Sequence, residues 1–222
     1  MIKILAIDTS TDACSAALLS DYKIRDRFVI APSAHTKFIL PMVDELLSEA
    51  QLDCSQLDAI AFGCGPGSFT GVRLVASIAQ GFAFAANLPV IEISTLRALA
   101  QEIFMEFKSP QVLVAQDARM QEIYWGEYRV DSVGIMQPII SDKLIKPHEA
   151  EVISREGFVG VGGGFSVYSD LFAKNCNMHI YAKQYVQSKY IVQLAADDFA
   201  KGVKVSVEKA LPVYLREKVA WV

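Results

Sequence analysis

Histidine and cysteine are scarce in this sequence, and neither is arranged for metal binding. The three histidines lie far apart and form no H-x-x-x-H pair, the spacing that puts two imidazoles on one face of a helix. They are His35, His148 and His179. The four cysteines have no C-x-x-C spacing and stand in or beside apolar sequence, as buried free thiols do. They are Cys14, Cys54, Cys64 and Cys176. The sequence therefore predicts no metal site.

The sequence also lacks a run of basic residues and a secretory leader. Its formal net charge is −4, whereas a protein that holds nucleic acid by itself needs clustered Lys and Arg to neutralise phosphates. The segment Ile2–Asp8 has no basic region, long apolar stretch or small-residue cleavage site of the kind that a secretory signal carries. We therefore expect a cytoplasmic protein without a membrane anchor, which meets RNA only through a complex.

What the sequence does have is apolar residues enough for a large core, 52% of 222. Alternating and buried runs predict strands, and a 3.6-residue period predicts helices. The expected order in the first half is strands at 2–8, 13–19 and 22–29, a helix at 35–50, a strand at 58–63, a helix at 70–86, a strand at 90–93 and a helix at 95–107. This β-β-β-α-β-α-β-α order predicts a mixed sheet with helices packed against it.

The pattern restarts beyond Ser109-Pro110. Further strands are expected at 112–116, 123–130 and 158–162, and a helix at 188–201. We therefore predict two α/β lobes, an N-terminal lobe of residues 1–107 and a smaller C-terminal lobe of residues 108–222.

A glycine-rich segment, Gly65-Pro66-Gly67-Ser68-Phe69-Thr70-Gly71, joins a predicted buried strand to a predicted helix. Such a junction directs backbone N–H groups and a helix dipole toward a bound anion. The same residues also suit a tight turn with Ser68 or Thr70 as helix cap. The segment has neither the lysine of a phosphate-binding P-loop nor the G-x-G-x-x-G order, so turn and cap are the preferred interpretation.

The helix predicted at 70–86 is apolar on nearly every side. After its first residue only Arg73, Ser77 and Gln80 are polar, and their spacing puts them in one narrow stripe. Such a helix must be buried on most sides, but a sheet covers only one. We therefore expect the other side to meet the helix at 35–50 or a second protein chain.

Four segments together resemble the TsaB family. They are Ile4–Ser10, the Gly65–Gly71 loop with Val72 and Arg73, Asp117-Ala118-Arg119-Met120 followed by Tyr124, and Pro212–Arg216. The family's motif residues in this sequence are Asp8, Gly65, Pro66, Gly67, Ser68, Phe69, Thr70, Gly71, Arg73, Asp117 and Arg119. The resemblance covers essentially the whole chain, and the glycine loop is its most specific part.

The resemblance implies a two-lobed actin-like (ASKHA, ribonuclease H-like) α/β fold, with mixed sheets flanked by helices. It also implies a subunit without catalytic residues. The related catalytic subunit, TsaD, carries an H-x-x-x-H metal motif, and Thr95 and Leu99 stand at the corresponding positions here. Neither side chain can replace a histidine as a metal ligand, so no metal is expected.

Partners follow from the same resemblance. TsaB pairs with TsaD through helices of the N-terminal lobe, the ATPase TsaE joins the pair, and TsaC supplies threonylcarbamoyl-adenylate. TsaD then modifies the adenosine beside the anticodon of tRNAs that read codons beginning with A. The expected partner-binding residues are His35, Phe38, Ile39, Met42, Leu46, Val72, Val75, Ile78, Ala79 and Phe82. Without its partner the chain is expected to form a homodimer through this surface.

The sequence departs from the family at Val75, where glycine is usual, and at Gln80, where lysine is usual. One alternative function is a nucleotide-binding regulator that uses Asp8 and the Gly162-Gly163-Gly164 run. No cofactor is expected, with ATP or ADP at the complex interface as the one alternative. A metallopeptidase and a small-molecule kinase are weaker alternatives. The missing histidine pair argues against the first, and the absence of glycine after Asp8 argues against the second.

Overall fold

The structure is a computed structural model that describes residues 1–150, 157–173, 178–183 and 185–216. It divides into two compact units: unit 1 is Met1–Ala98 with Tyr185–Val213, and unit 2 is Leu99–Gln184 with Tyr214–Val222. The division differs from the expected one at residue 107. The reason is α6 (Ser188–Ala200), which returns to unit 1 and packs against its first two strands.

Unit 1 is built on a five-stranded mixed sheet in the order β3-β2-β1-β4-β5. Its strands are β1 (Ile4–Asp8), β2 (Ala13–Ser20), β3 (Lys23–Ile30), β4 (Ala59–Gly65) and β5 (Val90–Ser94). The first three form an antiparallel meander, and β1, β4 and β5 run parallel. Since both faces of β1 are fully buried, helices must cover both.

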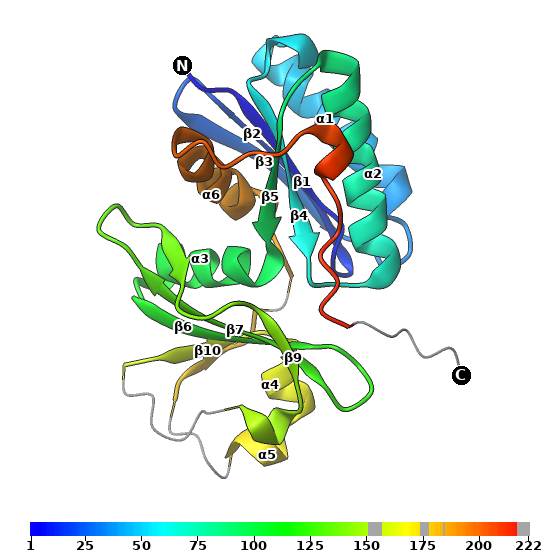
Figure 1. Cartoon of the computed structure of the whole chain (residues 1–222). Coiled ribbons are helices and arrows are strands. Elements are labelled where there is room, and N and C mark those ends of the chain that lie inside the picture. The colour runs from blue at the N-terminus through cyan, green and yellow to red at the C-terminus, as the bar shows by residue number, and fades with distance from the viewer. Residues whose placement is uncertain (151–156, 174–177, 184, 217–222) are drawn as a thin grey trace. The chain divides into compact units, whose positions relative to one another are not determined.

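Helices α1 (His35–Ala50) and α2 (Phe69–Ala86) cover one face of this sheet, and α6 covers the other (Figure 1). Leu5 and Ile7 of β1 belong to the core cluster beneath α1 and α2. The intervening positions, Ile4 and Ala6, point to the opposite face because side chains alternate along a strand. The expected mixed sheet with helices against it is confirmed.

Local sequence accounts for where these helices begin and end. The Ser68 Oγ accepts a hydrogen bond from Gly71 N at 3.1 Å, which satisfies one free N–H at the start of α2. The capping residues that follow α2 and α1, Asn87 and Gln51, both have left-handed backbone conformation. Helix α1 has the bounds that the sequence predicts, and α2 begins one residue earlier.

Unit 2 repeats the same design. Its six-stranded sheet has the path β11-β10-β6-β7-β8, with β9 also paired to β7. The strands are β6 (Gln111–Asp117), β7 (Ile123–Val130), β8 (Met136–Pro138), β9 (Lys143–Ile145), β10 (Val159–Val161) and β11 (Ile180–Tyr181). As in unit 1, a hairpin of the first two strands is followed by parallel pairing of the first strand with a later one. Two mixed sheets of matching order confirm the expected actin-like class.

The helices of unit 2 are short apart from the first. Helix α3 (Thr95–Phe107) starts in unit 1, has the predicted bounds, and continues into unit 2. Helices α4 (Gly163–Val167) and α5 (Ser169–Ala173) follow β10. The unit has its own apolar cluster around Leu113, Trp125 and Phe165.

Candidate functional site

The glycine loop between β4 and α2 is shaped by contact with the end of β1. A Cβ atom on Gly67 would lie 2.6 Å from the Ser10 carbonyl oxygen, and one on Gly71 would overlap the Thr9 carbonyl oxygen. Ser68 N donates to Ser10 O at 2.8 Å, and the Thr9 Oγ1 donates to Gly71 O at 2.7 Å. The loop therefore uses its glycines for close packing and its Ser68 as a cap, as the turn-and-cap interpretation predicts.

Asp8 is enclosed beneath this loop rather than open to a ligand. Its side chain is 0% exposed, and Oδ1 accepts from Ser10 N at 3.0 Å and from Ser10 Oγ at 2.9 Å. A Cβ atom on Gly63 would overlap Asp8 Oδ2. Burial raises the pKa of Asp8 to about 7, although both hydrogen bonds from Ser10 lower it.

The residues that stand in place of a histidine pair are both buried. The Thr95 Oγ1 donates to Pro66 O at 2.5 Å, and Leu99 is 1% exposed. In the part of the chain that the structure describes, no group of three or more His, Cys, Asp or Glu residues could hold a metal ion. Thr95 instead fastens the glycine loop to the start of α3.

The motif residues Phe69 and Arg73 form a separate contact on the first turn of α2. The Arg73 guanidinium carbon lies 3.3 Å from the centre of the Phe69 ring, a cation–π arrangement. Both side chains are exposed, as is Thr70. The amino-terminal turn of α2 therefore presents a cation and a ring at the surface.

Most residues expected to bind a partner lie in the core of unit 1 instead. Six of them are 8% exposed or less: Ile39, Met42, Leu46, Val72, Val75 and Ala79. His35, Ile78 and Phe82 are half-buried, and only Phe38 is exposed. Helical periodicity finds the apolar side of a helix but does not reveal whether a sheet or another protein covers it. For these six residues the cover is the chain's own sheet.

The surface that α2 leaves uncovered is nevertheless apolar. Phe84 is 79% exposed, and Gly81 and Ala85 are also exposed. A Cβ atom on Gly81 would meet nothing within 4 Å, so the helix backbone is open to a close neighbour there. On α1, Phe38 and Leu40 are 38% and 51% exposed and flank the buried Ile39 on either side. We call these five exposed residues of the two helices the outer α1/α2 face.

The expectation that α2 is buried on nearly all sides does not hold within the chain. Only a third of its 18 residues are buried. Helix α2 also has the length and hydropathy of a membrane span, but one such helix is weak evidence for a span.

Among the polar residues of α2, Gln80 does not face solvent. Its Nε2 donates to Val207 O at 3.2 Å and to Ala210 O at 3.0 Å, which ties the following segment to the helix.

In unit 2, Asp117 is the last residue of β6, and Arg119 lies in the loop between β6 and β7. Arg119 N donates to Asp117 Oδ1 at 3.0 Å, and the Arg119 guanidinium lies 3.3 Å from Asp117 Oδ2. Tyr168 also donates to Asp117 Oδ1, at 3.3 Å. Arg216, from the other end of the sequence, reaches the same loop and forms a 2.5 Å ion pair with Glu122. We call the loop, Ala118–Glu122, the 118–122 turn.

The Gly162–Gly164 run and the cysteines give no indication of a ligand site. The Gly162–Gly164 run packs tightly, since a Cβ atom on Gly164 would lie 2.8 Å from Ala115 O. Cys14 and Cys64 are buried and Cys54 is half-buried, as expected for free thiols; Cys176 lies outside the described residues.

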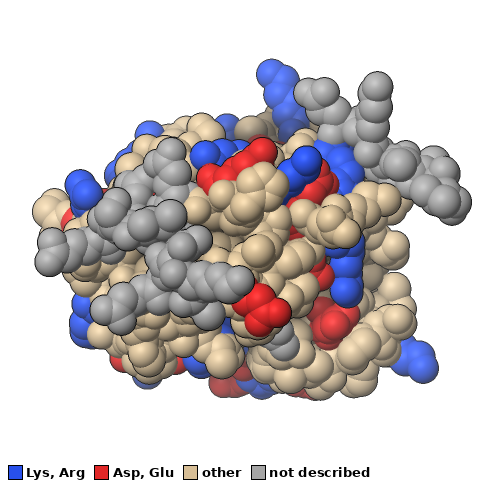
Figure 2. Space-filling model, turned by 90° about the horizontal axis from the view of Figure 1, so that it is seen from below, with Lys and Arg blue, Asp and Glu red and all other residues tan. Residues whose placement is uncertain are grey.

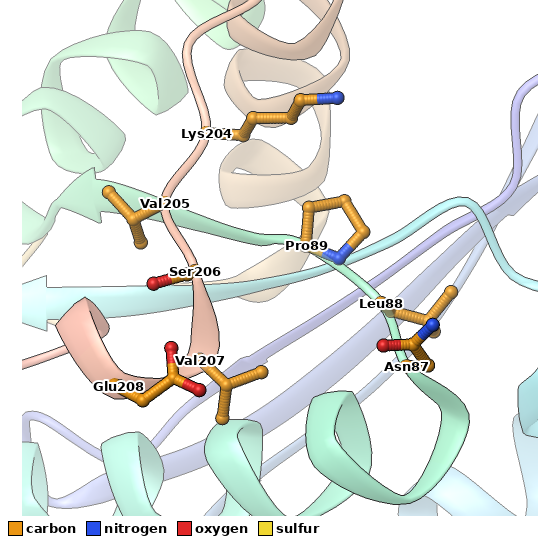
Figure 3. A pocket seen from close by; sticks show the side chains of 8 residues that line it. All are labelled: Asn87, Leu88, Pro89, Lys204, Val205, Ser206, Val207 and Glu208. Atoms are coloured by element: carbon orange, nitrogen blue, oxygen red, sulfur yellow. The ribbon is translucent and has the colours of Figure 1, made fainter.

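A hollow of about 430 Å³ lies between the α2–β5 loop and residues 204–208 (Figure 3). Its polar groups do not converge. Ser206 donates to Glu208, and the Lys204 ammonium points away from both. Ligand sites gather a few polar groups at one point, and this hollow does not.

Comparison with known proteins identifies the family. The model of the family "TsaD: tRNA N6-adenosine threonylcarbamoyltransferase" matches residues 29–222. Over 225 residues the chain is 40% identical to the tRNA threonylcarbamoyladenosine biosynthesis protein TsaB of Escherichia coli K12, covering 99% of this chain and 97% of the relative. The chain belongs to the TsaB family.

Other relatives agree with this assignment. The TsaB protein of Haemophilus influenzae is 40% identical over 228 residues, covering 99% of this chain and 96% of the relative. A solved structure, YeaZ from Pseudomonas aeruginosa, is 38% identical with a TM-score of 0.89 and covers 97% of this chain and 100% of that one. The resemblance read from the sequence motifs is therefore confirmed for the whole TsaB-family chain.

Two features of the site could not be read from the sequence of this TsaB-family chain. Phe84 and Leu40 were missed as surface residues because they fit the apolar pattern of their helices. The contact between Arg216 and the 118–122 turn joins residues 94 apart, and no local pattern signals such a pairing.

Proposed function

We propose that this chain is a non-catalytic subunit of tRNA threonylcarbamoyladenosine biosynthesis, which binds a TsaD-type transferase through the outer α1/α2 face. The observation that carries this proposal is the exposed apolar surface of α2, centred on Gly81 and Phe84. A solvated helix normally exposes charged side chains, whereas the second half of α2 exposes an aromatic ring, an alanine and a bare glycine backbone. Covering these with a partner helix removes apolar area from water.

A supporting role rather than catalysis agrees with the side chains beside the glycine loop. Thr95 and Leu99 offer a hydroxyl and an alkyl group where a metal-binding transferase needs imidazoles. The Thr95 hydroxyl already donates to Pro66 O. Asp8 is enclosed beneath the packed loop. These side chains therefore support a structural role rather than a catalytic one.

Contact with tRNA through the complex agrees with the distribution of charge. Among the described residues on the face drawn in Figure 2, acidic and basic side chains are interspersed, and they form no large basic patch. A net charge of −4 makes non-specific attraction to phosphates weak. We expect the chain to work in the cytoplasm, where it joins TsaD and the ATPase TsaE and uses the product of TsaC. In their absence we expect a homodimer through the outer α1/α2 face.

The nucleotide-binding alternative gains no specific support from the glycines of unit 2. Gly162 and Gly164 are both required for close approach to the Ala115 carbonyl oxygen, so their occurrence needs no ligand. ATP or ADP at the complex interface stays an expectation, to be tested by calorimetric titration of the chain alone and of the complex.

The test is reconstitution of tRNA threonylcarbamoylation from purified TsaC, TsaD and TsaE of the same organism, with and without this chain. Gly81→Glu and Phe84→Glu place a charge on the outer α1/α2 face without disturbing the core. Both are expected to lower affinity for TsaD at least tenfold and to abolish the modified nucleoside in mass spectrometry, with unchanged thermal unfolding.

Val133→Glu provides the matched control, because Val133 is 71% exposed and lies in unit 2. It makes the same kind of change and is expected to leave both affinity and modification at the wild-type level. If the wild-type chain neither binds TsaD nor promotes modification, the proposed function is wrong. If it does both and the α2 variants do the same, the partner-binding surface lies elsewhere.

A further inference from the structure

The segment that follows α6 runs along unit 1 before the chain enters unit 2. Val205 and Val90 of β5 exchange two main-chain hydrogen bonds, from Val205 N at 2.8 Å and from Val90 N at 3.0 Å. At the far end of the segment, Val213 N donates to Cys64 O at 2.8 Å. We call residues 205–213, drawn at the red end of the colour scale in Figure 1, the C-terminal strap.

Two polar side chains of unit 1 hold the middle of the strap. The Gln80 amide of α2 donates to two strap carbonyl groups, those of Val207 and Ala210. Glu92 Oε1, on β5, accepts a hydrogen bond from Leu211 N at 3.0 Å. The strap is therefore attached to the helix that carries the exposed apolar surface and to the edge strand beside it.

The end of β4 is shaped to receive the strap. The register between β4 and β5 shifts between Gly63 and Gly65, so that Cys64 is an extra residue without a counterpart in β5. A bulged residue leaves the regular ladder, and the Cys64 carbonyl group accordingly accepts from Val213 N. A Cβ atom on Gly65 would lie 2.9 Å from Val213 O. The strap thus packs against the first residue of the glycine loop.

The strap buries few of its own side chains. Within it only Ala210 is fully buried, whereas Leu211 and Val213 are 57% and 42% exposed. Segments with few buried apolar groups open locally at a lower free-energy cost than the core does. The strap is therefore an element with two states, bound and detached, and the hydrogen bonds of Gln80 and Glu92 favour the bound state.

Beyond the strap, Arg216 fastens the chain to unit 2. Arg216 lies three residues after Val213. Its Nη2 donates to Ala118 O at 3.1 Å and forms the 2.5 Å ion pair with Glu122. Three residues of extended chain span about 10 Å. Because so little chain separates Val213 from Arg216, a displacement of the strap is passed on to the Arg216 backbone.

The 118–122 turn depends on the support that Arg216 gives. Three consecutive residues, Arg119, Met120 and Gln121, have φ values of 62°, 53° and 60°. L-residues avoid this left-handed conformation because the Cβ atom crowds a neighbouring carbonyl oxygen. A run of three persists only where its surroundings hold it. We therefore expect the turn to loosen when Arg216 is displaced.

We propose that the C-terminal strap couples α2 to the 118–122 turn. In the bound state of the strap Arg216 is held in position and the turn is ordered, and in the detached state both loosen together. The coupling goes beyond the proposed function, which gives the strap no role. Gln80 directly precedes Gly81 of the outer α1/α2 face, so a partner on α2 acts beside an attachment point of the strap. Coupling free energies are reciprocal, so loosening the turn must also detach the strap.

The experiment is hydrogen exchange of the full chain, followed amide by amide by NMR. The reporters are hydrogen-bonded amides, Leu211 and Val213 in the strap and Ala118 and Glu122 in the turn. Gln80→Ala is expected to speed exchange at least tenfold in the strap and at least threefold in the turn. Ser77→Ala is the matched control, because Ser77 is an exposed polar residue about one turn earlier on α2. It should leave all four amides within twofold of the wild-type rates.

The reverse direction uses Arg216→Gln, which breaks the ion pair with Glu122. Exchange is expected to speed up in the turn and, by reciprocity, in the strap. If Arg216→Gln fails to fold, Glu122→Gln removes the same ion pair from the other side. Amides of β1 should exchange at the wild-type rate in every variant.

The inference is overturned if Gln80→Ala leaves the strap amides at the wild-type rate, or speeds exchange in the strap without changing the turn. It is also overturned if exchange speeds up equally in β1, because the variant then lowers the stability of the whole chain and shows no separate coupling.

Adding TsaD to the wild-type chain separates this inference from the proposed function. Bound TsaD is expected to slow exchange in both the strap and the turn. If the variants show the coupling and TsaD does not bind, the proposed function is wrong and the coupling stands. If TsaD binds and the variants show no coupling, the coupling is wrong and the proposed function stands.

Discussion

At the residue scale, Asp8 shows how strongly burial changes a carboxyl group. Among the described residues no donor reaches its Oδ2, and Oδ1 takes both hydrogen bonds from Ser10. With a pKa of about 7 the folded chain holds the Asp8 proton at pH values where the unfolded chain, near 3.8, has released it. This carboxyl therefore contributes stability that is fully present below pH 4 and is lost as the pH rises through 7.

Asp8→Asn tests this linkage. The amide cannot ionise. The free energy of unfolding of the variant should therefore rise relative to that of the wild-type chain between pH 4 and pH 8, by up to about 4 kcal/mol for a three-unit shift. Urea unfolding at a series of pH values measures the difference. Asp26→Asn, which makes the same change at an exposed carboxylate of β3, is the control. Curves for wild type and Asp8→Asn that stay parallel across this range would contradict the assignment.

At the scale of single elements, sequence periodicity predicted most of the fold. The bounds of α1, α3 and β7 agree with the structure because each has a long, regular apolar pattern. Strands β8, β9 and β11 were not predicted, since two or three residues are too few to show a period of two. Elements supported mainly by tertiary pairing leave little local trace in the sequence.

The candidate site was predicted less well than the fold, and α2 explains why. Its apolar residues surround the helix, so periodicity could not separate Val75, which is fully buried, from Phe84, which is 79% exposed. Glycine also has two different structural roles in this chain. Gly71 permits packing against Thr9, and Gly81 leaves an open backbone.

A pair of truncations distinguishes the two sides of the α1/α2 layer. Phe62→Ala, at a fully buried position of β4, should lower the free energy of unfolding by about 3–5 kcal/mol. Phe84→Ala should change it by less than about 0.5 kcal/mol, because the ring is already in water. Chemical denaturation of both variants provides the measurement. A large loss from Phe84→Ala would mean that its ring packs inside the chain.

At the scale of the whole molecule, the two units share one strand order. The first strand of each sheet ends in a motif aspartate, Asp8 in β1 and Asp117 in β6. A glycine with φ of 114° follows or ends the strand that pairs parallel to it, Gly65 in unit 1 and Gly162 in unit 2. The sequence indicated two lobes but not this correspondence, because the residues between the matching positions differ.

The return of α6 to unit 1 predicts that the N-terminal lobe is not self-sufficient. Ile191, Leu194 and Ala195 of α6 are all 0% exposed and cover the face of the sheet opposite α1 and α2. A fragment of residues 1–107 should therefore aggregate or lack cooperative thermal unfolding by circular dichroism. A fusion of residues 1–98 to residues 185–213 through a flexible linker should unfold cooperatively, because it restores α6. Cooperative unfolding of the fragment of residues 1–107 would show that unit 1 folds without α6.

This discontinuity has a consequence for how the chain is made. On the ribosome the first sheet emerges long before the helix that closes its second face, with 86 residues between Ala98 and Tyr185. At about 5–20 residues per second the nascent chain carries an uncovered apolar sheet for on the order of 10 s. During that interval we expect the nascent sheet to bind chaperones, because its second apolar face stays uncovered until translation has passed α6.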